Sequence, residues 1–134
     1  MQTILKISEA AAIALHAADY LAGHPGLRSA QEIAKALDVS YNHLSKVLQQ
    51  LTRADLLTPV RGPKGGFSLS PSGKKAAVRD FMTAIDGPVK LHACLMGAKV
   101  CRHKNCMFGR FLEETNKRFD AVLDGKISEF SKRK

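Results

Sequence analysis

Three cysteines lie within one short stretch of the chain, and their thiolates are the side chains best suited to bind a metal. They are Cys94, Cys101 and Cys106, with six and four residues between them. An odd number of clustered cysteines is a poor disulfide framework, and such a cluster more often binds metal or responds to redox change. Residues 88–107 contain four Lys or Arg and no acidic residue. Positive charge of this kind lowers thiol pKa values and offsets the charge of an anionic iron–sulfur cluster.

Zinc and free thiols are the alternatives to a cluster at these cysteines. Zinc prefers four nitrogen or sulfur ligands in a tetrahedron, and His92 or His103 would complete such a site beside the three thiolates. The chain contains no Cys-x-x-Cys pair, which lowers the fit to a zinc ribbon. Composition alone therefore leaves the cluster, zinc and free thiols open.

The charge of the chain favours a polyanion as its partner. The 134 residues carry 21 Lys and Arg against 12 Asp and Glu, a net charge of +9. Residues 1–30 sum to zero, whereas residues 31–80 carry +4 and residues 81–108 carry +3. A small domain this basic typically binds nucleic acid, and charge that only keeps the protein soluble is the simpler alternative.

The composition is that of one folded domain. Hydrophobic residues make up 45% of the chain and charged residues 25%, which is ordinary for a globular protein. No apolar run approaches the roughly 18 residues of a membrane span. The first residues lack the pattern of a signal peptide. We therefore expect a cytoplasmic protein with no membrane contact.

The apolar spacing in the first part of the chain predicts three helices. The first opens near Ser8 and ends at the Gly-His-Pro-Gly run of residues 23–26. The second opens with Ser29 and Glu32, the S-x-x-E pattern of a capping box. Ser40 can cap the third, in which apolar residues recur at intervals of three and four. The second and third helices are short and joined by a tight turn, which predicts a helix-turn-helix that can enter a DNA major groove.

Residues 57–69 predict a β-hairpin with a basic, glycine-rich tip. Two apolar segments, 57–60 and 67–69, flank the sequence Arg-Gly-Pro-Lys-Gly-Gly. Glycines allow the backbone of the tip to approach a phosphate or a groove wall closely. A hairpin directly after a helix-turn-helix is the wing of a winged helix. A further helical region is predicted from Ser70 to Asp86.

The last segment predicts an amphipathic helix rich in phenylalanine. Four of the six phenylalanines lie in it, at positions 108, 111, 119 and 130. Such a face is buried either on its own domain or against a second copy of the chain, and we expect a homodimer. The predicted fold is therefore mainly α: a winged helix-turn-helix with a short β-hairpin wing in residues 1–86, a cysteine-bearing loop in 87–107, and a long C-terminal dimerisation helix with a basic tail in 108–134.

Three blocks of sequence, in this order, resemble the IscR/NsrR regulators, which form the Rrf-two family. They are Val39-Ser40-Tyr41-Asn42-His43-Leu44, then Val60-Arg61-Gly62-Pro63-Lys64-Gly65-Gly66-Phe67, then the three close cysteines. The Val-Arg-Gly-Pro-x-Gly-Gly wing is the most specific of the three. The resemblance implies a dimeric bacterial winged-helix transcription factor, and several members of the family carry an iron–sulfur cluster. The Asn-His pair is closer to the nitric-oxide-sensing NsrR branch than to the IscR branch.

The resemblance also implies which residues contact DNA. Asparagine can pair bidentately with adenine, and serine and histidine reach base edges or phosphates. Arg61 resembles the family arginine that enters the minor groove, where A·T-rich narrowing favours a cation. The expected contacts lie at the start of the third helix, further along it, and on the wing: Ser40, Tyr41, Asn42, His43, Ser45, Lys46, Arg53, Arg61, Gly62 and Lys64.

The fourth ligand of a cluster is also a matter of resemblance. In the IscR branch a histidine follows the last cysteine by three residues, but here that position is Gly109. In part of the NsrR branch a carboxylate near the N-terminus of the other subunit completes the site, and Glu9 stands at the matching position. The metal ligands predicted are Cys94, Cys101, Cys106 and Glu9, with His92 and His103 as local alternatives to Glu9. The cysteine spacing differs slightly from that of the family, which leaves [2Fe-2S] and [4Fe-4S] both open.

These features together predict a sequence-specific transcriptional regulator. Its partners are a double-stranded DNA operator and a second copy of the chain, and its operator affinity is set by an iron–sulfur cluster that senses redox state, nitric oxide or cluster supply. The alternative is a cluster-free regulator of the same fold, switched by a metabolite, a partner protein or thiol oxidation. We expect no enzyme activity, because no acid–base pair, phosphate-binding loop or activated nucleophile is recognisable.

Overall fold

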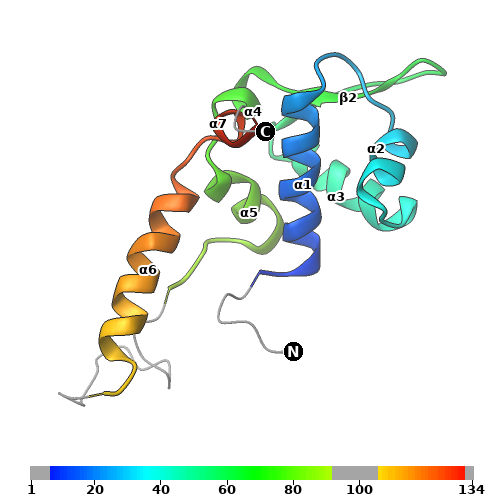
Figure 1. Ribbon diagram of the computed structural model, residues 1–134. Helices are drawn as coiled ribbons and strands as arrows, with labels where there is room; N and C mark the ends of the chain where they lie inside the picture. The colour runs from blue at the N-terminus through cyan, green and yellow to red at the C-terminus, as the bar shows by residue number, and fades with distance from the viewer. Residues whose placement is uncertain (1–6, 92–105, 132–134) are drawn as a thin grey trace.

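A computed structural model describes residues 7–91 and 106–131 of the chain. The elements follow one another as α1 (Glu9–Gly23), α2 (Ala30–Leu37), α3 (Tyr41–Arg53), β1 (Leu57–Val60), β2 (Gly66–Leu69), α4 (Pro71–Lys75), α5 (Val78–Asp86), α6 (Gly109–Leu123) and α7 (Ile127–Ser131). In Figure 1, α1 runs through the middle of the molecule, α2 and α3 lie to one side of it with the hairpin, and α6 projects to the other side. Within the described residues, no helix is both long and apolar enough to cross a membrane.

Serine caps begin the helices that the sequence predicted in the first part of the chain. The Oγ atoms of Ser8, Ser29 and Ser40 accept hydrogen bonds from the backbone N–H three residues further on. Each cap satisfies one of the backbone donors that a helix leaves without an internal partner at its start. The predicted helix-turn-helix, formed by α2 and α3, is confirmed.

The core forms around the alanine-rich face of α1. Side chains on α1, α2, α3 and α5 meet there with almost no exposed surface, among them Ala14, Ala17, Ile33, Leu44, Leu48, Leu51 and Phe81. Small side chains on α1 let the neighbouring helices come close, so that the larger side chains of α3 and α5 fill the space between them. This packing fixes the inner face of α3 and leaves its outer face to solvent.

The predicted hairpin is present and is joined to the segment before α2. Strands β1 and β2 pair antiparallel, with Leu57 opposite Leu69 and Val60 opposite Gly66. Arg28 adds a backbone bridge to Phe67, with N···O distances of 3.0 and 2.8 Å in the two directions. A Cβ atom on Gly66 would lie 2.5 Å from the carbonyl oxygen of Arg28. Only glycine permits this approach, so the wing is held by backbone on both sides.

We expect the substitution Gly66→Ala to lower the free energy of unfolding by about 1–3 kcal/mol, the usual cost of forcing extra atoms into a packed site. Urea unfolding followed by circular dichroism would measure it. Gly109→Ala is the matched control, because its Cβ would meet only the Cβ of Cys106 at 3.6 Å and alanine favours helix. Equal stability of the Gly66→Ala variant and the native chain would contradict the close approach.

The helical region predicted from Ser70 to Asp86 is divided into α4 and α5. Ala76 and Ala77 between them are extended, with ψ angles of 151° and 163°. The N–H of Val78 donates to the carbonyl of Gly125 at 2.9 Å, and the N–H of Ile127 donates to the carbonyl of Ala76 at 3.4 Å. These bonds to the segment between α6 and α7 replace the helical hydrogen bonds that a continuous helix would make.

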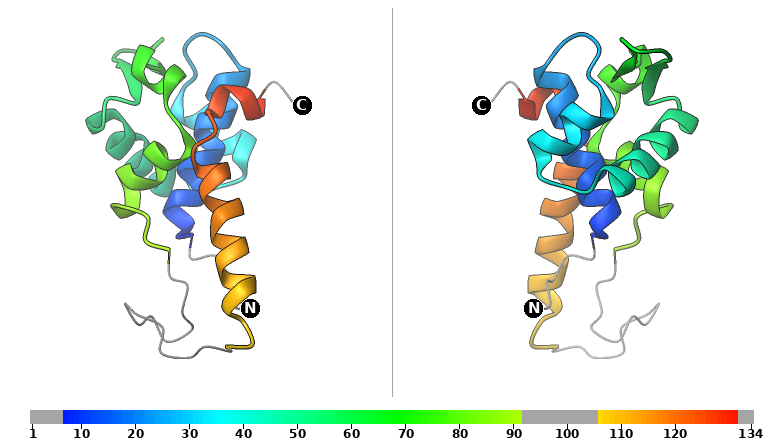
Figure 2. Two further views of the ribbon diagram at one scale, coloured as in Figure 1. Left: turned by 90° about the vertical axis from the view of Figure 1, so that its left-hand side faces the viewer. Right: turned by 90° about the vertical axis from the view of Figure 1, so that its right-hand side faces the viewer.

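The single terminal helix that was predicted is likewise two helices, α6 and α7. The second lies beyond the end of α6, beside α1, near the top of the molecule in Figures 1 and 2. Ile127 on α7 is 4% exposed and belongs to the same core as α1 and α5. The predicted division of the chain at residues 86 and 107 stays a prediction, with α7 adding to the core of the first part.

Candidate functional site

The first turn of α3 presents polar side chains to solvent. Its start is fixed by Ser40, whose Oγ accepts from the N–H of His43 at 3.0 Å. Tyr41 is 50% exposed, Asn42 is exposed, and His43 is half-buried. The opposite side of α3 is held in the core by Leu44, Val47, Leu48 and Leu51. The structure therefore brings four predicted contact residues together on one exposed helix start, which is the part of a helix-turn-helix that reaches base edges.

Ser45 is placed differently from its neighbours. Its Oγ is buried and has no hydrogen-bond partner within the described residues. The surface that carries Tyr41 and Asn42 therefore does not include the hydroxyl of Ser45, although sequence reasoning grouped them.

Four further predicted contact residues are exposed cations. Lys46 and Arg53 are exposed further along α3, and Arg61 and Lys64 are exposed on the loop between β1 and β2. None of the four forms an ion pair with another described residue. Their charges are thus available to an external anion such as a phosphate group.

The tip of the hairpin is a tight turn that exposes its backbone. Gly62 has a φ angle of +110°, a backbone conformation that residues other than glycine rarely adopt. The N–H of Gly65 donates to the carbonyl of Gly62 at 2.9 Å and closes the turn. The hairpin extends to the same side of the molecule as α2 and α3, away from α6 (Figure 1).

A polar network that sequence reasoning missed connects α1 and α2 with Arg28, which lies in the segment between them. The hydroxyl of Tyr20 donates to Glu32 at 2.9 Å, and Glu32 pairs with Arg28 at 3.5 Å. The ring of Tyr20 stacks on that of His24 with centroids 4.0 Å apart. The hydrogen bond to Glu32 raises the pKa of Tyr20. No local pattern reveals a contact between residues 12 positions apart across a turn, so the sequence gives no signal for it.

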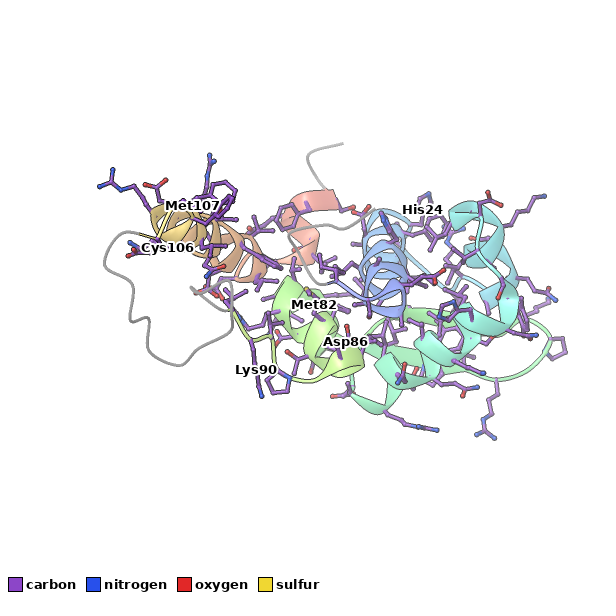
Figure 3. All side chains as sticks on the ribbon, turned by 90° about the horizontal axis from the view of Figure 1, so that it is seen from below. His24, Met82, Asp86, Lys90, Cys106 and Met107 are labelled. Atoms are coloured by element: carbon purple, nitrogen blue, oxygen red, sulfur yellow. The ribbon has the colours of Figure 1, made fainter. Side chains whose placement is uncertain are left out.

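The cysteine site is only partly within the described residues. Cys94, Cys101, His92 and His103 lie outside them. Cys106 is half-buried, and its carbonyl accepts from the N–H of Gly109 at 3.1 Å at the start of α6. Figure 3 shows Cys106 and Met107 at the end of α6 that points away from α1.

Glu9 is exposed in the first turn of α1. The start of α1 and the start of α6 lie apart in all views, so one chain does not bring Glu9 and Cys106 together (Figures 1 and 2). Within the described residues, no three His, Cys, Asp or Glu side chains are grouped to hold a metal ion. The predicted donor set, three cysteine sulfurs and one carboxylate, nevertheless has the chemistry that an iron–sulfur cluster requires of its ligands.

A family model named Rrf2 and described as "Iron-dependent Transcriptional regulator" matches residues 7–127. The chain belongs to the Rrf2 family. A chain named as the HTH-type transcriptional regulator BadM, from Rhodopseudomonas palustris, is 35% identical over 83 residues, which are 61% of this chain and 53% of BadM. A chain from Aquifex aeolicus, named only as an HTH-type transcriptional regulator, is 32% identical over 95 residues, or 70% of this chain and 66% of that one. The matches thus span between about half and two thirds of these Rrf2 relatives' lengths.

Solved structures similar to this Rrf2 chain cover nearly all of it. The CymR structure, named the global cysteine regulator of B. subtilis, has a TM-score of 0.74 at 21% identity and covers 98% of this chain and 99% of its own. The T. potens IscR structure has a TM-score of 0.70 at 24% identity, with 97% and 88% covered. At 21% and 24% sequence identity, this structural similarity establishes the fold and nothing more. The predicted family and the winged-helix fold are both confirmed.

Proposed function

We propose that this Rrf2-family chain is a sequence-specific DNA-binding transcriptional regulator that acts as a homodimer. The observation that carries the proposal is the exposed start of α3, on the side of the molecule to which a hairpin with two exposed cations also extends. The α3 start enters the major groove, where Asn42 pairs with adenine and Tyr41 and His43 meet base edges or phosphates. The wing places Arg61 at the adjacent minor groove. Lys46, Arg53 and Lys64 meet the phosphate backbone.

The second copy is inferred from the uncovered face of α6. Exposed large apolar side chains gather on and just before this helix: Met107, Phe108, Phe111 and Val122, with exposures of 88%, 43%, 47% and 52%. A row of this kind is unfavourable in water and is buried when a second copy pairs with it. Two-fold symmetry then presents two α3 helices to two half-sites of a palindromic operator.

Control of operator affinity by an iron–sulfur cluster is the regulatory part of the proposal. Cys94, Cys101 and Cys106 would hold the cluster, and Glu9 of the partner subunit would complete it. Two observations support this: the family description names iron, and Cys106 stands at the outer end of α6, apart from the start of its own α1. A cluster supplies redox and nitric-oxide chemistry, and its assembly reports cluster supply. Cys106 as a ligand would fix the free end of α6, so the state of the site bears on the dimer.

A cluster-free regulator is the second candidate, and one observation favours it. The CymR structure, 99% of which this chain covers, is that of a protein named a global cysteine regulator. In that case a metabolite, a partner protein or oxidation of the thiols would change operator affinity instead.

One experiment tests both the DNA binding and its control by an iron–sulfur cluster. The chain is purified without oxygen, its iron and sulfide are measured, and genomic fragments that it retains are sequenced and titrated with and without metal. Selective retention of fragments supports the DNA-binding proposal, and an affinity that differs between the two forms supports the cluster. Retention with equal affinity favours the cluster-free regulator, and failure to select any fragment in either form overturns the DNA-binding proposal.

Removing one cation that binds a phosphate should weaken the salt dependence of the operator affinity by a calculable amount. In a dimer, Lys46→Gln removes two phosphate contacts, so the slope of log K against log salt concentration becomes shallower by about 1.8, or 0.9 for each contact. Fluorescence anisotropy at several salt concentrations measures the slope. Lys117→Gln removes the same charge from the outer side of α6 and should leave the slope unchanged. Identical slopes for the Lys46→Gln variant and the native protein would exclude Lys46 from the interface.

A further inference from the structure

Arg79 on α5 holds the C-terminal part of α6 through two aspartates one helical turn apart. Its guanidinium donates to Asp120, and its Nε and Nη2 both donate to Oδ1 of Asp124, at 3.3 and 3.2 Å. Hydrogen bonds to Asp120 and Asp124 raise the pKa of Arg79 above its ordinary value. The planar guanidinium can bind both carboxylates at fixed angles, which a lysine ammonium cannot do.

The backbone beside this contact joins the same two parts of the chain. Ala77 bridges to Lys126, and Val78 N–H bonds to the Gly125 carbonyl at 2.9 Å. Leu123 at the last turn of α6 is fully buried. The C-terminal end of α6 is therefore attached to the start of α5 both by backbone and by the Arg79 side chain.

The other end of α6 is exposed, whereas α5 is part of the packed core. Phe108 and Phe111 near the start of α6 are 43% and 47% exposed, and this end projects beyond the body of the molecule (Figure 2). Helix α5 packs on α1 and α3, with Phe81 fully buried. Its last residue, Asp86, accepts a hydrogen bond from Ser8 at 2.6 Å, which fixes its other end to α1. The direction of α6 relative to α3 is thus set where α5 meets α6.

We infer that Arg79 is a positioning residue that determines the half-site spacing accepted by the dimer, because it fixes the angle between α6 and the DNA-reading helix α3. The inference rests on the proposed function, since it concerns how two copies are placed on DNA. In a dimer paired through α6, a change in that angle moves the two α3 helices relative to each other. Half-sites of helix-turn-helix dimers lie about one DNA turn, 34–36 Å, apart, so a small change in angle changes the best spacing.

The exposure of Arg79 separates this role from a role in stability. Its side chain is 33% exposed, and those of Asp120 and Asp124 are 54% and 70% exposed. Ion pairs this accessible to water add little to the stability of a fold. We therefore expect Arg79→Gln to fold normally and to differ from the native protein in geometry.

The test uses an operator selected by the native dimer from a randomised DNA library. Binding is then measured on duplexes in which the two half-sites are moved apart or together by one and two base pairs. We expect the native protein to prefer one spacing, and Arg79→Gln to reduce the ratio of best to worst affinity by roughly fivefold or more. Arg79→Lys, which keeps the charge without the planar fork, should restore part of the preference. Lys117→Gln breaks only the exposed pair with Glu113 within α6 and should keep the native profile.

Hydrogen exchange provides a measurement without DNA. The amides of Val78 and Ile127, which bond across the contact between α5 and the end of α6, should exchange faster in Arg79→Gln, while amides in the middle of α3 stay unchanged.

An unchanged spacing profile, or an equal loss of affinity at every spacing, overturns the inference, because the second result is what a merely structural role produces. Unchanged exchange at Val78 and Ile127 also overturns it. If the native protein selects no DNA, the proposed function fails, and the exchange result still decides whether Arg79 holds α6 in place.

Discussion

The substitution Phe111→Glu is expected to convert the dimer into folded monomers. Phe111 is 47% exposed and touches Phe108 edge to face, with ring centroids 6.4 Å apart, so the fold of one chain does not depend on it. Burying a phenylalanine at an interface contributes about 1.5–3 kcal/mol. Because a two-fold symmetric interface buries Phe111 from both copies, this contribution is made twice. A buried carboxylate without a partner costs several kcal/mol more.

The loss of the dimer should appear as a loss of operator affinity. A monomer contacts one half-site and no longer has the second half-site at high effective concentration, which typically contributes a factor of 10²–10⁴. We therefore expect Phe111→Glu to bind the operator about 100-fold more weakly or worse. Sedimentation gives the oligomeric state and fluorescence anisotropy gives the affinity.

Lys117→Gln is the control for this substitution. It lowers the charge of the chain by the same amount and lies on the same helix, but its side chain is 77% exposed and pairs only with Glu113. It should remain a dimer with native affinity. A Phe111→Glu protein that sediments as a dimer would show that the apolar face of α6 is not where two copies meet.

The helix starts could be predicted because their causes are local. A serine cap is recognised from the cap residue and the apolar spacing that follows it, and Ser8, Ser29 and Ser40 all act in this way. The wing could be predicted for the same reason, since Gly62 and Gly66 mark a turn and a close approach.

The break between α4 and α5 has no local cause. Ala76 and Ala77 are good helix formers, and neither glycine nor proline separates the two helices. The break depends on backbone bonds to residues 125–127, about fifty positions away. Arg79 is similar, because its partners lie 41 and 45 residues further along the chain. Contacts of that range depend on the complete fold and leave no pattern in a single sequence.

The predicted DNA-contact residues were chosen by their types, without regard to the direction of each side chain. Asn42 and Lys46 are exposed, whereas the Oγ of Ser45 is buried. The signal for this difference was present in the sequence: Ser45 adjoins Leu44 and lies one turn before Leu48, both fully buried, so helical spacing alone places it at the edge of the inner face.

The second large effect is expected from Cys106→Ala, which should remove the iron and sulfide of the protein purified without oxygen. Cys106 is half-buried at the start of α6, and its structural bond to Gly109 uses the backbone carbonyl, so the variant should fold. Met107→Ala is the matched control, because Met107 is the next residue, is 88% exposed and has no thiolate to offer. Metal analysis and the visible absorption spectrum report the result.

The operator affinity of these variants connects the cysteine to the proposed regulation. If the cluster sets the affinity, native protein with and without it should differ by roughly 5–150-fold, the usual range for coupled sites. Cys106→Ala should then match the cluster-free native protein under all conditions, and Met107→Ala should follow the native protein in both states. Zinc in place of iron in the native protein would indicate the tetrahedral zinc site, since three cysteines and a histidine would satisfy it. A colourless native protein whose operator affinity is unaffected by Cys106→Ala would show that Cys106 has no part in DNA binding. The regulator controlled by a metabolite or a partner protein would then be the explanation, because the α3 and wing surface does not depend on Cys106.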